Sequence, residues 1–180
     1  MKATGIVRRI DDLGRVVIPK EIRRTMRIRE GDPLEIYTSR DGEVIFKKYS
    51  LLGGVEDFAA ELCETMSRST GSVCAVTDRD TVIAVAGGGK RELLGKRITA
   101  ELEQIMEGRR IYQYAADGKA IPVCDGNDKL TVAVAAPILA EGDLLGVVLF
   151  ISAEGAAATG DTEYKLAQTI AAFLGRHMES

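Results

Sequence analysis

Basic side chains crowd the first part of the sequence. Residues 1–29 carry 9 Lys/Arg and 3 Asp/Glu, a net charge of +6, whereas the whole 180-residue chain has a formal net charge of −3. Arginine presents a planar fork of N–H donors, which suits phosphate oxygens and guanine edges better than the point charge of lysine. The cluster therefore predicts a nucleic acid as partner. The candidate binding residues are Arg8, Arg9, Arg15, Lys20, Arg23, Arg24 and Arg27.

Part of this cluster falls on a short predicted helix. Ile22 and Met26 lie within about 40° of each other on a helical wheel. Between about 100° and 200° from Ile22 lie four basic residues, namely Lys20, Arg23, Arg24 and Arg27. Arg23 and Arg24 are therefore expected to face solvent. A merely solvated charged face is the alternative interpretation, but such a helix normally interleaves more carboxylates than Glu21 alone.

Signatures of catalysis and metal binding are missing from the sequence. It contains no Gly-x-Ser-x-Gly, His-Glu-x-x-His or Cys-x-x-Cys,. The single histidine, His177, lies near the end and is expected to be structural. Cys63, Cys74 and Cys124 are odd in number and far apart, so we expect buried thiols rather than disulfides or a zinc site. The sequence thus predicts no enzyme, no catalytic residue, no metal and no cofactor.

One glycine-rich segment invites a different interpretation. Consecutive N–H groups and two cations at residues 87–91, Gly-Gly-Gly-Lys-Arg, could cradle a phosphate,. The segment fails the phosphate-loop pattern, because no Ser or Thr follows the Gly-Lys pair, and it also fails the dinucleotide fingerprint. We therefore interpret it as a loop between secondary-structure elements.

The composition indicates a folded chain in two parts. Hydrophobic residues make up 46% and charged residues 28% of the sequence, which is normal globular usage. Residues 1–50 have a net charge of +4 and the rest −7. The longest apolar stretch, residues 130–140, is too short to span a bilayer and contains Pro137. With no apolar signal region at the start, we expect a cytoplasmic protein without a membrane partner.

The first fifty residues are expected to form a β-rich unit. Strands are predicted at residues 4–10 and 15–18, on either side of a turn at 11–14. Pro19 suits the first position of a helix that ends by Gly31. Strands at 34–38 and from 44 flank the hairpin signal Asp41-Gly42. Fifty residues bury little apolar surface alone, so we expect two copies to share one core.

The rest of the chain predicts an α+β body of the sensor type. We expect domains at residues 1–50 and 55–180, joined by a linker at 51–54. A helix begins at Val55, Thr99 could cap another, and a final helix begins near Asp161. Strands are expected at residues 72–77, 81–86, 111–115, 131–139 and 144–152.

Residues 4–25 and 33–37 resemble the DNA-binding half of the AbrB transition-state regulators, with Gly-Arg-Val-Val-Ile-Pro at 14–19 as a specific signature. The resemblance implies a swapped-hairpin β-barrel dimer, in which two chains interleave and present arginines to double-stranded DNA. Arg9 stands where the family tends to have another basic residue, and Lys20 replaces an often apolar one. Residues 26–28 lack the glycine that often follows the helix. The DNA-contacting arginines of the family fall on Arg8, Arg15, Arg23 and Arg24.

The body resembles a GAF domain, a fold used for small-molecule sensing. The whole chain is similar to sporulation regulators of this architecture. That likeness implies an activator and repressor of late sporulation genes, a homotetramer held through the C-terminal domain, and an unknown small-molecule ligand as a further possibility. Two alternatives remain open: an antitoxin-like protein that binds a toxin and DNA, and a small-molecule-binding module with an incidental basic arm.

Overall fold

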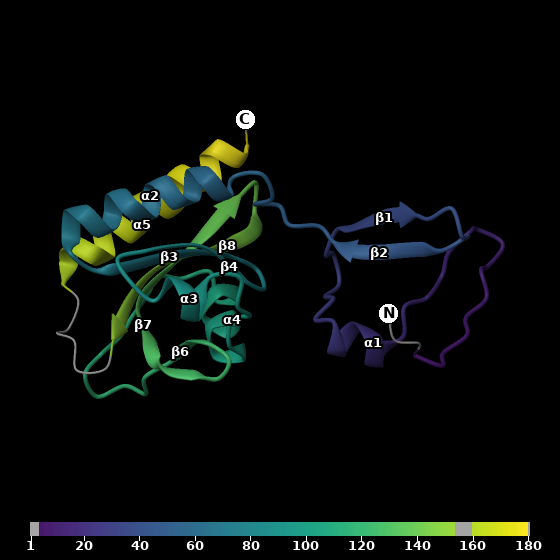
Figure 1. Cartoon of the computed structure of the whole chain (residues 1–180), viewed down its shortest axis with the longest axis horizontal. Coiled ribbons are helices and arrows are strands. Elements are labelled where there is room, and N and C mark those ends of the chain that lie inside the picture. The colour runs from purple at the N-terminus through teal and green to yellow at the C-terminus, as the bar shows by residue number, and fades with distance from the viewer. Residues whose placement is uncertain (1–3, 154–159, 180) are drawn as a thin grey trace. The chain divides into compact units, whose positions relative to one another are not determined.

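The computed structural model describes residues 4–153 and 160–179. The chain divides into two units, here called the N-terminal unit, Met1–Tyr49, and the body, Ser50–Ser180 (Figure 1). None of the helices in the described ranges has both the length and the apolar character needed to cross a membrane.

A helix and a hairpin are the regular elements of the N-terminal unit. Helix α1 covers Lys20–Thr25, and strands β1 (Leu34–Thr38) and β2 (Val44–Lys48) pair antiparallel. Pro19 occupies the N-cap position of α1, one residue before the first helical position that the sequence predicted for it,. Gly42 adopts φ +81° in the hairpin turn, a conformation that glycine reaches without a steric cost. The hairpin signal Asp41-Gly42 is thus confirmed.

Residues 4–10 and 15–18 differ from the prediction, because the single chain forms no strand there. The turn between them is present: the N–H of Gly14 donates to the carbonyl of Asp11 at 3.0 Å, and the N–H of Asp11 donates to the carbonyl of Arg15 at 3.0 Å. Beyond the turn the two segments run as extended loops (Figure 1). A strand needs a hydrogen-bonded neighbour, and these segments find none within the described part of the chain.

Many apolar side chains of the N-terminal unit are exposed to water. Val7 is 90% exposed, Leu13 70% and Val17 68%. Among residues 4–49 only Pro19 is buried. Hydrophobic burial is the dominant favourable term in folding, so the unit has no core of its own.

The body is built on a six-stranded antiparallel sheet. The strand order is β4-β3-β8-β7-β5, with β6 pairing β7. Strand β6 was not predicted. Of the strand expected at 111–115, only two residues are in a strand. The strands are β3 (Val73–Asp78), β4 (Val82–Ala86), β5 (Tyr112–Gln113), β6 (Pro122–Cys124), β7 (Asn127–Ala140) and β8 (Asp143–Ala153).

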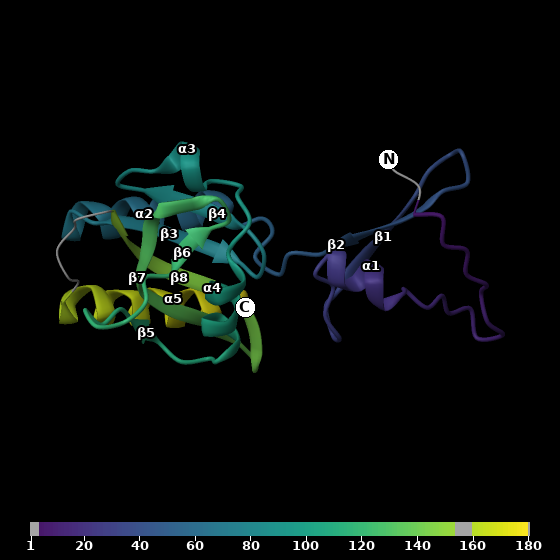
Figure 2. The ribbon, with the colours of Figure 1, turned by 90° about the horizontal axis from the view of Figure 1, so that it is seen from below.

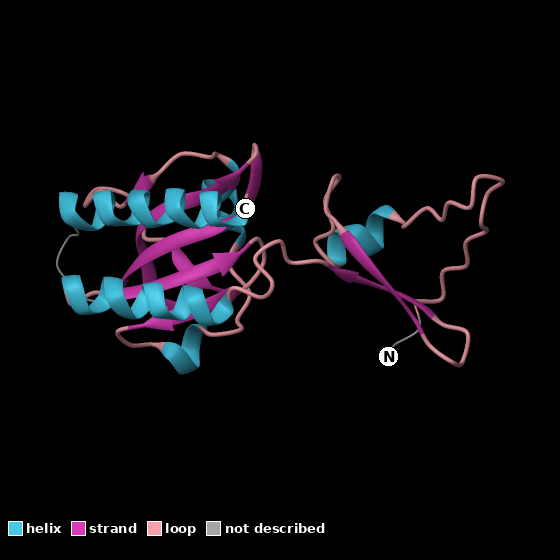
Figure 3. Cartoon of the chain, turned by 90° about the horizontal axis from the view of Figure 1, so that it is seen from above, coloured by secondary structure: helices cyan, strands magenta, loops and turns pink. Residues whose placement is uncertain are grey.

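Helices cover both faces of this sheet. On one face α2 (Glu56–Thr70) and α5 (Asp161–Met178) lie side by side (Figure 3), and α5 runs along β7 (Figure 2). The other face carries the single-turn α3 (Lys90–Leu93) and α4 (Ala100–Glu107). Thr99 caps α4 and α5 begins at Asp161, and both positions agree with the prediction.

Alternate residues of the central strands supply two buried clusters. Val148 and Phe150 of β8 pack beneath α2 and α5, whereas Val147 and Leu149 pack beneath α3 and α4. This period of two is the property of a strand buried on both faces. Leu52, expected in the linker, is 1% exposed and belongs to the first cluster.

Candidate nucleic-acid interface

The turn at residues 11–15 fixes one of the candidate arginines. Oδ1 of Asp11 accepts hydrogen bonds from the backbone N–H of Leu13 at 3.0 Å and of Arg15 at 2.8 Å. Oδ2 accepts a third from Nε of Arg15 at 2.8 Å. Within the described residues the Nη atoms of Arg15 make no hydrogen bond, so these donors are free to meet an anion.

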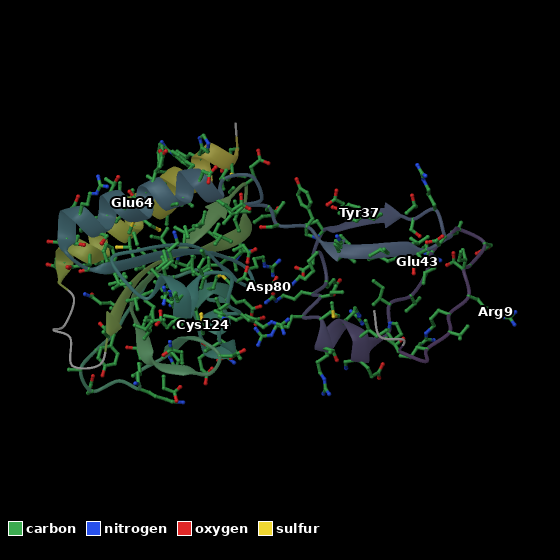
Figure 4. The ribbon with its side chains drawn as sticks, viewed as in Figure 1. Arg9, Tyr37, Glu43, Glu64, Asp80 and Cys124 are labelled. Carbon is green, nitrogen blue, oxygen red and sulfur yellow. The ribbon has the colours of Figure 1, made fainter. Side chains whose placement is uncertain are left out.

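The candidate residues differ in how far they reach solvent. Arg9 points away from the rest of its unit (Figure 4). Arg23 and Arg27 are half-buried. The exposed ones are Arg8, Arg9, Arg15, Lys20 and Arg24. Most of the predicted cluster is thus accessible on the N-terminal unit.

Arg23 departs from the solvent-facing position that the helical wheel predicted. It is half-buried, and its Nε is buried without a hydrogen-bond partner among the described residues. The chain reverses directly after α1 and brings the N–H of Ile28 to within 2.7 Å of the Arg23 carbonyl. Met26, expected on the apolar face, is 54% exposed. A six-residue helix followed by a sharp reversal does not keep the two faces that a longer helix would have.

The reversal after α1 is a Schellman motif. Arg27 adopts φ +50°, its N–H donates to the Arg24 carbonyl at 3.2 Å, and the N–H of Ile28 donates to the Arg23 carbonyl. Glycine usually occupies this left-handed position. The helix therefore ends in the motif that usually contains a glycine. Here an arginine adopts the strained left-handed conformation instead.

The body offers no activated nucleophile at its cysteines. Burial raises the pKa of Cys63 and of Cys74 to about 12, and that of Cys124 to about 11. All three are buried, as predicted, and Cys124 lies inside the body (Figure 4). A thiol with so high a pKa stays protonated at neutral pH and is inert.

The histidine and the glycine-rich segment that the sequence singled out also lie at positions where they support the fold. His177 lies in the last turn of α5, as predicted, and its ring centroid is 4.9 Å from that of Phe58. Gly87 to Gly89 form a loop with positive φ, and Gly89 caps α3. Among the described residues, no group of three or more His, Cys, Asp or Glu is placed to hold a metal.

A groove beside α5 was not predicted. It has a volume of about 390 Å³ and an apolar floor that includes Pro137 and Ala171. Arg109 and Arg176 line it, and Nη1 of Arg109 donates to the Gly142 carbonyl at 2.6 Å. The sequence carries no local signal for this groove, because its residues come from segments far apart in the chain.

Asp11 was also missed as a candidate, although a signal for it exists. Asp at the first position of a turn and Gly at the fourth are preferred in type I turns, where the Asp side chain bonds the following backbone. Residues 11–14, Asp-Asp-Leu-Gly, fit that pattern. The turn was predicted, but not the bond from its carboxylate to Arg15.

Comparison with known proteins covers both units. Residues 54–179 match the family model "Stage V sporulation protein T C-terminal, transcription factor". Residues 7–50 match "Antidote-toxin recognition MazE, bacterial antitoxin". The solved GAF domain of A. aeolicus nlh2 covers 70% of this chain and 87% of its own, with 14% identity and a TM-score of 0.50, a likeness in fold alone.

Two relatives from Bacillus subtilis (strain 168) match in sequence. The transition state regulatory protein AbrB is 63% identical over 49 residues, which is 27% of this chain and 50% of that protein. Stage V sporulation protein T is 49% identical over 180 residues, 99% of each chain. The fold expected from the sequence, an AbrB-type unit followed by a GAF-like body, is therefore confirmed. Both the full-length identity and the match over the body show that the chain belongs to the family of stage V sporulation protein T.

Proposed function

We propose that this chain is a sequence-specific, DNA-binding transcription regulator whose N-terminal unit binds double-stranded DNA through its arginines. The observation that carries the proposal is the exposed basic cluster of that unit, in which Arg15 is held by Asp11 with its Nη donors unbound. The matches to AbrB and to a sporulation transcription factor support it. On the same likeness we propose that it activates and represses late sporulation genes.

The DNA-binding unit is proposed to be a dimer. Exposed Val7 and Val17 lie on the two segments that form no strand in the single chain. A second copy would supply both the missing hydrogen-bonded neighbours and the apolar cover. We propose residues 1–50 as this swapped-hairpin module and 55–180 as the body, joined by a linker at 51–54 that Leu52 anchors to the body. Two chains then present eight cations, from Arg8, Arg15, Arg23 and Arg24 of each.

Salt dependence tests the electrostatic part of the proposal. Each neutralised phosphate releases counterions, so contact with about six phosphates gives a log–log slope of affinity against salt of about −5. Titration of the full chain against a duplex oligonucleotide at several salt concentrations measures this slope. A slope near zero would contradict phosphate contacts.

Removal of single arginines tests which side chains bind. We expect Arg24→Ala, and likewise Arg23→Ala, to abolish binding to the specific duplex while the chain stays folded. Arg24 is the cleaner test because it is exposed, whereas Arg23 is half-buried. Arg40→Ala is the matched control, since Arg40 is also an exposed arginine of the N-terminal unit and removes the same charge. Equal affinity of Arg24→Ala and wild type in a gel-shift titration would refute the assignment.

Self-association of the body is proposed to complete a homotetramer. The rings of Phe58 of α2 and Phe173 of α5 pack against each other at a tilt of 50°, with centroids 5.9 Å apart, and Phe173 remains 48% exposed. Aromatic side chains are enriched at protein–protein surfaces. We expect Phe173→Gln to convert tetramers to dimers in light scattering, whereas an unchanged mass would place the contact elsewhere.

A ligand-sensing function is favoured by one observation, the groove beside α5. Arg109 and Arg176 line this groove together with Glu179, so two cations and one carboxylate surround an apolar floor. The excess positive charge suits a small molecule with an anionic group. Thermal-shift screening of the full chain with small carboxylates tests it. An antitoxin function is favoured by the match of residues 7–50 to the MazE model, and copurification of a small ribonuclease would support it.

A further inference from the structure

We propose that Asp11 is a positioning residue for DNA binding, whose carboxylate holds the guanidinium of Arg15 and leaves its Nη donors for the phosphate backbone. This inference rests on the proposed function, because it concerns how one arginine of the N-terminal unit meets DNA. It assigns a DNA-binding role to an acidic residue, although its negative charge alone would repel a phosphate.

The two oxygens of the Asp11 carboxylate have different partners. Oδ1 accepts from the backbone N–H groups of Leu13 and Arg15, at 3.0 and 2.8 Å, and so closes the turn. Oδ2 accepts only from Nε of Arg15, at 2.8 Å. Asp11 thus accepts one hydrogen bond from the backbone of Arg15 and another from its side chain. The turn therefore fixes both where Arg15 leaves the chain and how its guanidinium is oriented.

Nothing else in the described chain holds this guanidinium. The Arg15 side chain is 69% exposed, and Asp11 is its one ion-pair partner among the described residues. A long exposed side chain loses its rotamer freedom when it binds a ligand, and that loss weakens binding. An arginine already ordered by Nε loses less, while the Nη atoms keep their capacity for charge-assisted hydrogen bonds to phosphate.

The carboxylate is charged under the conditions in which it must act. The hydrogen bond from the Arg15 backbone, followed by the bond from its side chain, lowers the pKa of Asp11 below its ordinary value. Arg15 is therefore held throughout the neutral pH range.

The neighbouring carboxylate provides a matched control. Asp12 is exposed and makes no hydrogen bond or ion pair within the described residues. Removing the charge of either residue changes the net charge of the unit equally. If Asp11 acted only as a negative charge, both neutralising substitutions would strengthen DNA binding to a similar extent.

The test compares Asp11→Asn with Asp12→Asn in the full-length chain, using a duplex oligonucleotide that the wild-type chain binds. Asparagine keeps a carbonyl oxygen for the turn but replaces Oδ2 by an NH₂ group, which cannot accept from Nε. We expect D12N to bind as wild type or tighter, and D11N to bind about three- to tenfold more weakly. In an Arg15→Ala background, D11N is expected to cause no further loss.

The outcomes separate the inference from the proposed function. If the wild-type chain binds no duplex at low salt, the proposed function fails. If wild type binds and D11N matches D12N, or if D11N weakens binding equally in the Arg15→Ala background, the positioning role is refuted and DNA binding stands. Circular dichroism monitors the fold. Should D11N unfold the unit, Asp11→Ser, whose hydroxyl can still cap the turn, is compared with D12N under the same criteria.

Discussion

Lys48 and Arg27 are joined across 21 positions of the sequence: Nζ of Lys48 donates a hydrogen bond to the backbone carbonyl of Arg27 at 2.8 Å. The same ammonium lies 3.7 Å from Oδ2 of Asp32, whose side chain is only 3% exposed. The bond connects the chain reversal after α1 to strand β2. The hairpin thereby holds in place the short helix that carries Lys20 and Arg24.

We predict that Lys48→Met weakens the N-terminal unit by about 2 kcal/mol, because it removes a charge-assisted hydrogen bond and the ion pair with the buried side chain of Asp32,. The matched control is Lys47→Met, because Lys47 lies over the Tyr37 ring at 4.6 Å instead and its exposed cation–π contact is worth about 0.5 kcal/mol. Urea unfolding followed by circular dichroism measures both. A smaller loss for Lys48 than for Lys47 would contradict the role of the bond to Arg27.

The left-handed backbone at Arg27 leads to a second prediction. Arg27→Gly and Arg27→Ala remove the same cation, but only glycine adopts φ +50° without a Cβ clash,. We expect the glycine variant to be more stable than the alanine variant by about 1 kcal/mol. The urea concentration at the midpoint of unfolding is compared between the two variants. Equal midpoints would show that the turn carries no strain.

Thr99 is predicted to be important for the stability of the body. Its Oγ1 accepts from the N–H of Leu102 at 3.2 Å and donates to the Pro122 carbonyl at 2.8 Å, at 5% exposure. Thr99→Ala loses the cap of α4 and the hydrogen bond to the Pro122 carbonyl, so we expect a loss of about 2 kcal/mol. Thr99→Ser keeps the hydroxyl and is expected to lose less than half as much. Thermal unfolding of both variants provides the comparison.

The cysteines are predicted to be unreactive in the folded chain. Their raised pKa values mean that folding favours the neutral thiol, so this contribution to stability is fully present below pH 9 and is lost as the pH rises through about 11 to 12,. At pH 8 a thiol reagent is expected to react with Cys63, Cys74 and Cys124 only after urea is added. Rapid reaction of the native chain would contradict their burial.

Features encoded by a few neighbouring residues were predictable from the sequence. The turn at 11–14, the start of α1 after Pro19 and the Thr99 cap each depend on local chemistry and are present in the structure. The strands at residues 4–10 and 15–18 were not found in the single chain, because strand formation depends on a neighbour that local sequence does not supply. The burial of Leu52, within the predicted linker, could not be predicted either, because it depends on distant parts of the body.

The candidate site likewise combines features that local sequence determines with features that depend on the folded chain. The residue types and their clustering near the N-terminus could be predicted, because charge is a property of the sequence alone. The half-burial of Arg23 could not, since it depends on where a six-residue helix ends and which way the chain turns afterwards. The bond from Asp11 to Arg15 required the coordinates of the turn.

The two units are expected to respond differently to dilution. The body buries its apolar clusters within one chain, so its melting temperature should vary less with protein concentration than that of the N-terminal unit. The N-terminal unit, with Val7 and Val17 in water, must gain its apolar cover from outside the chain, and its melting temperature should rise as concentration increases. In a cell, chains at low concentration would then have a folded body but a DNA-binding unit that lacks its shared core. Regulation would begin only above a threshold concentration of the protein.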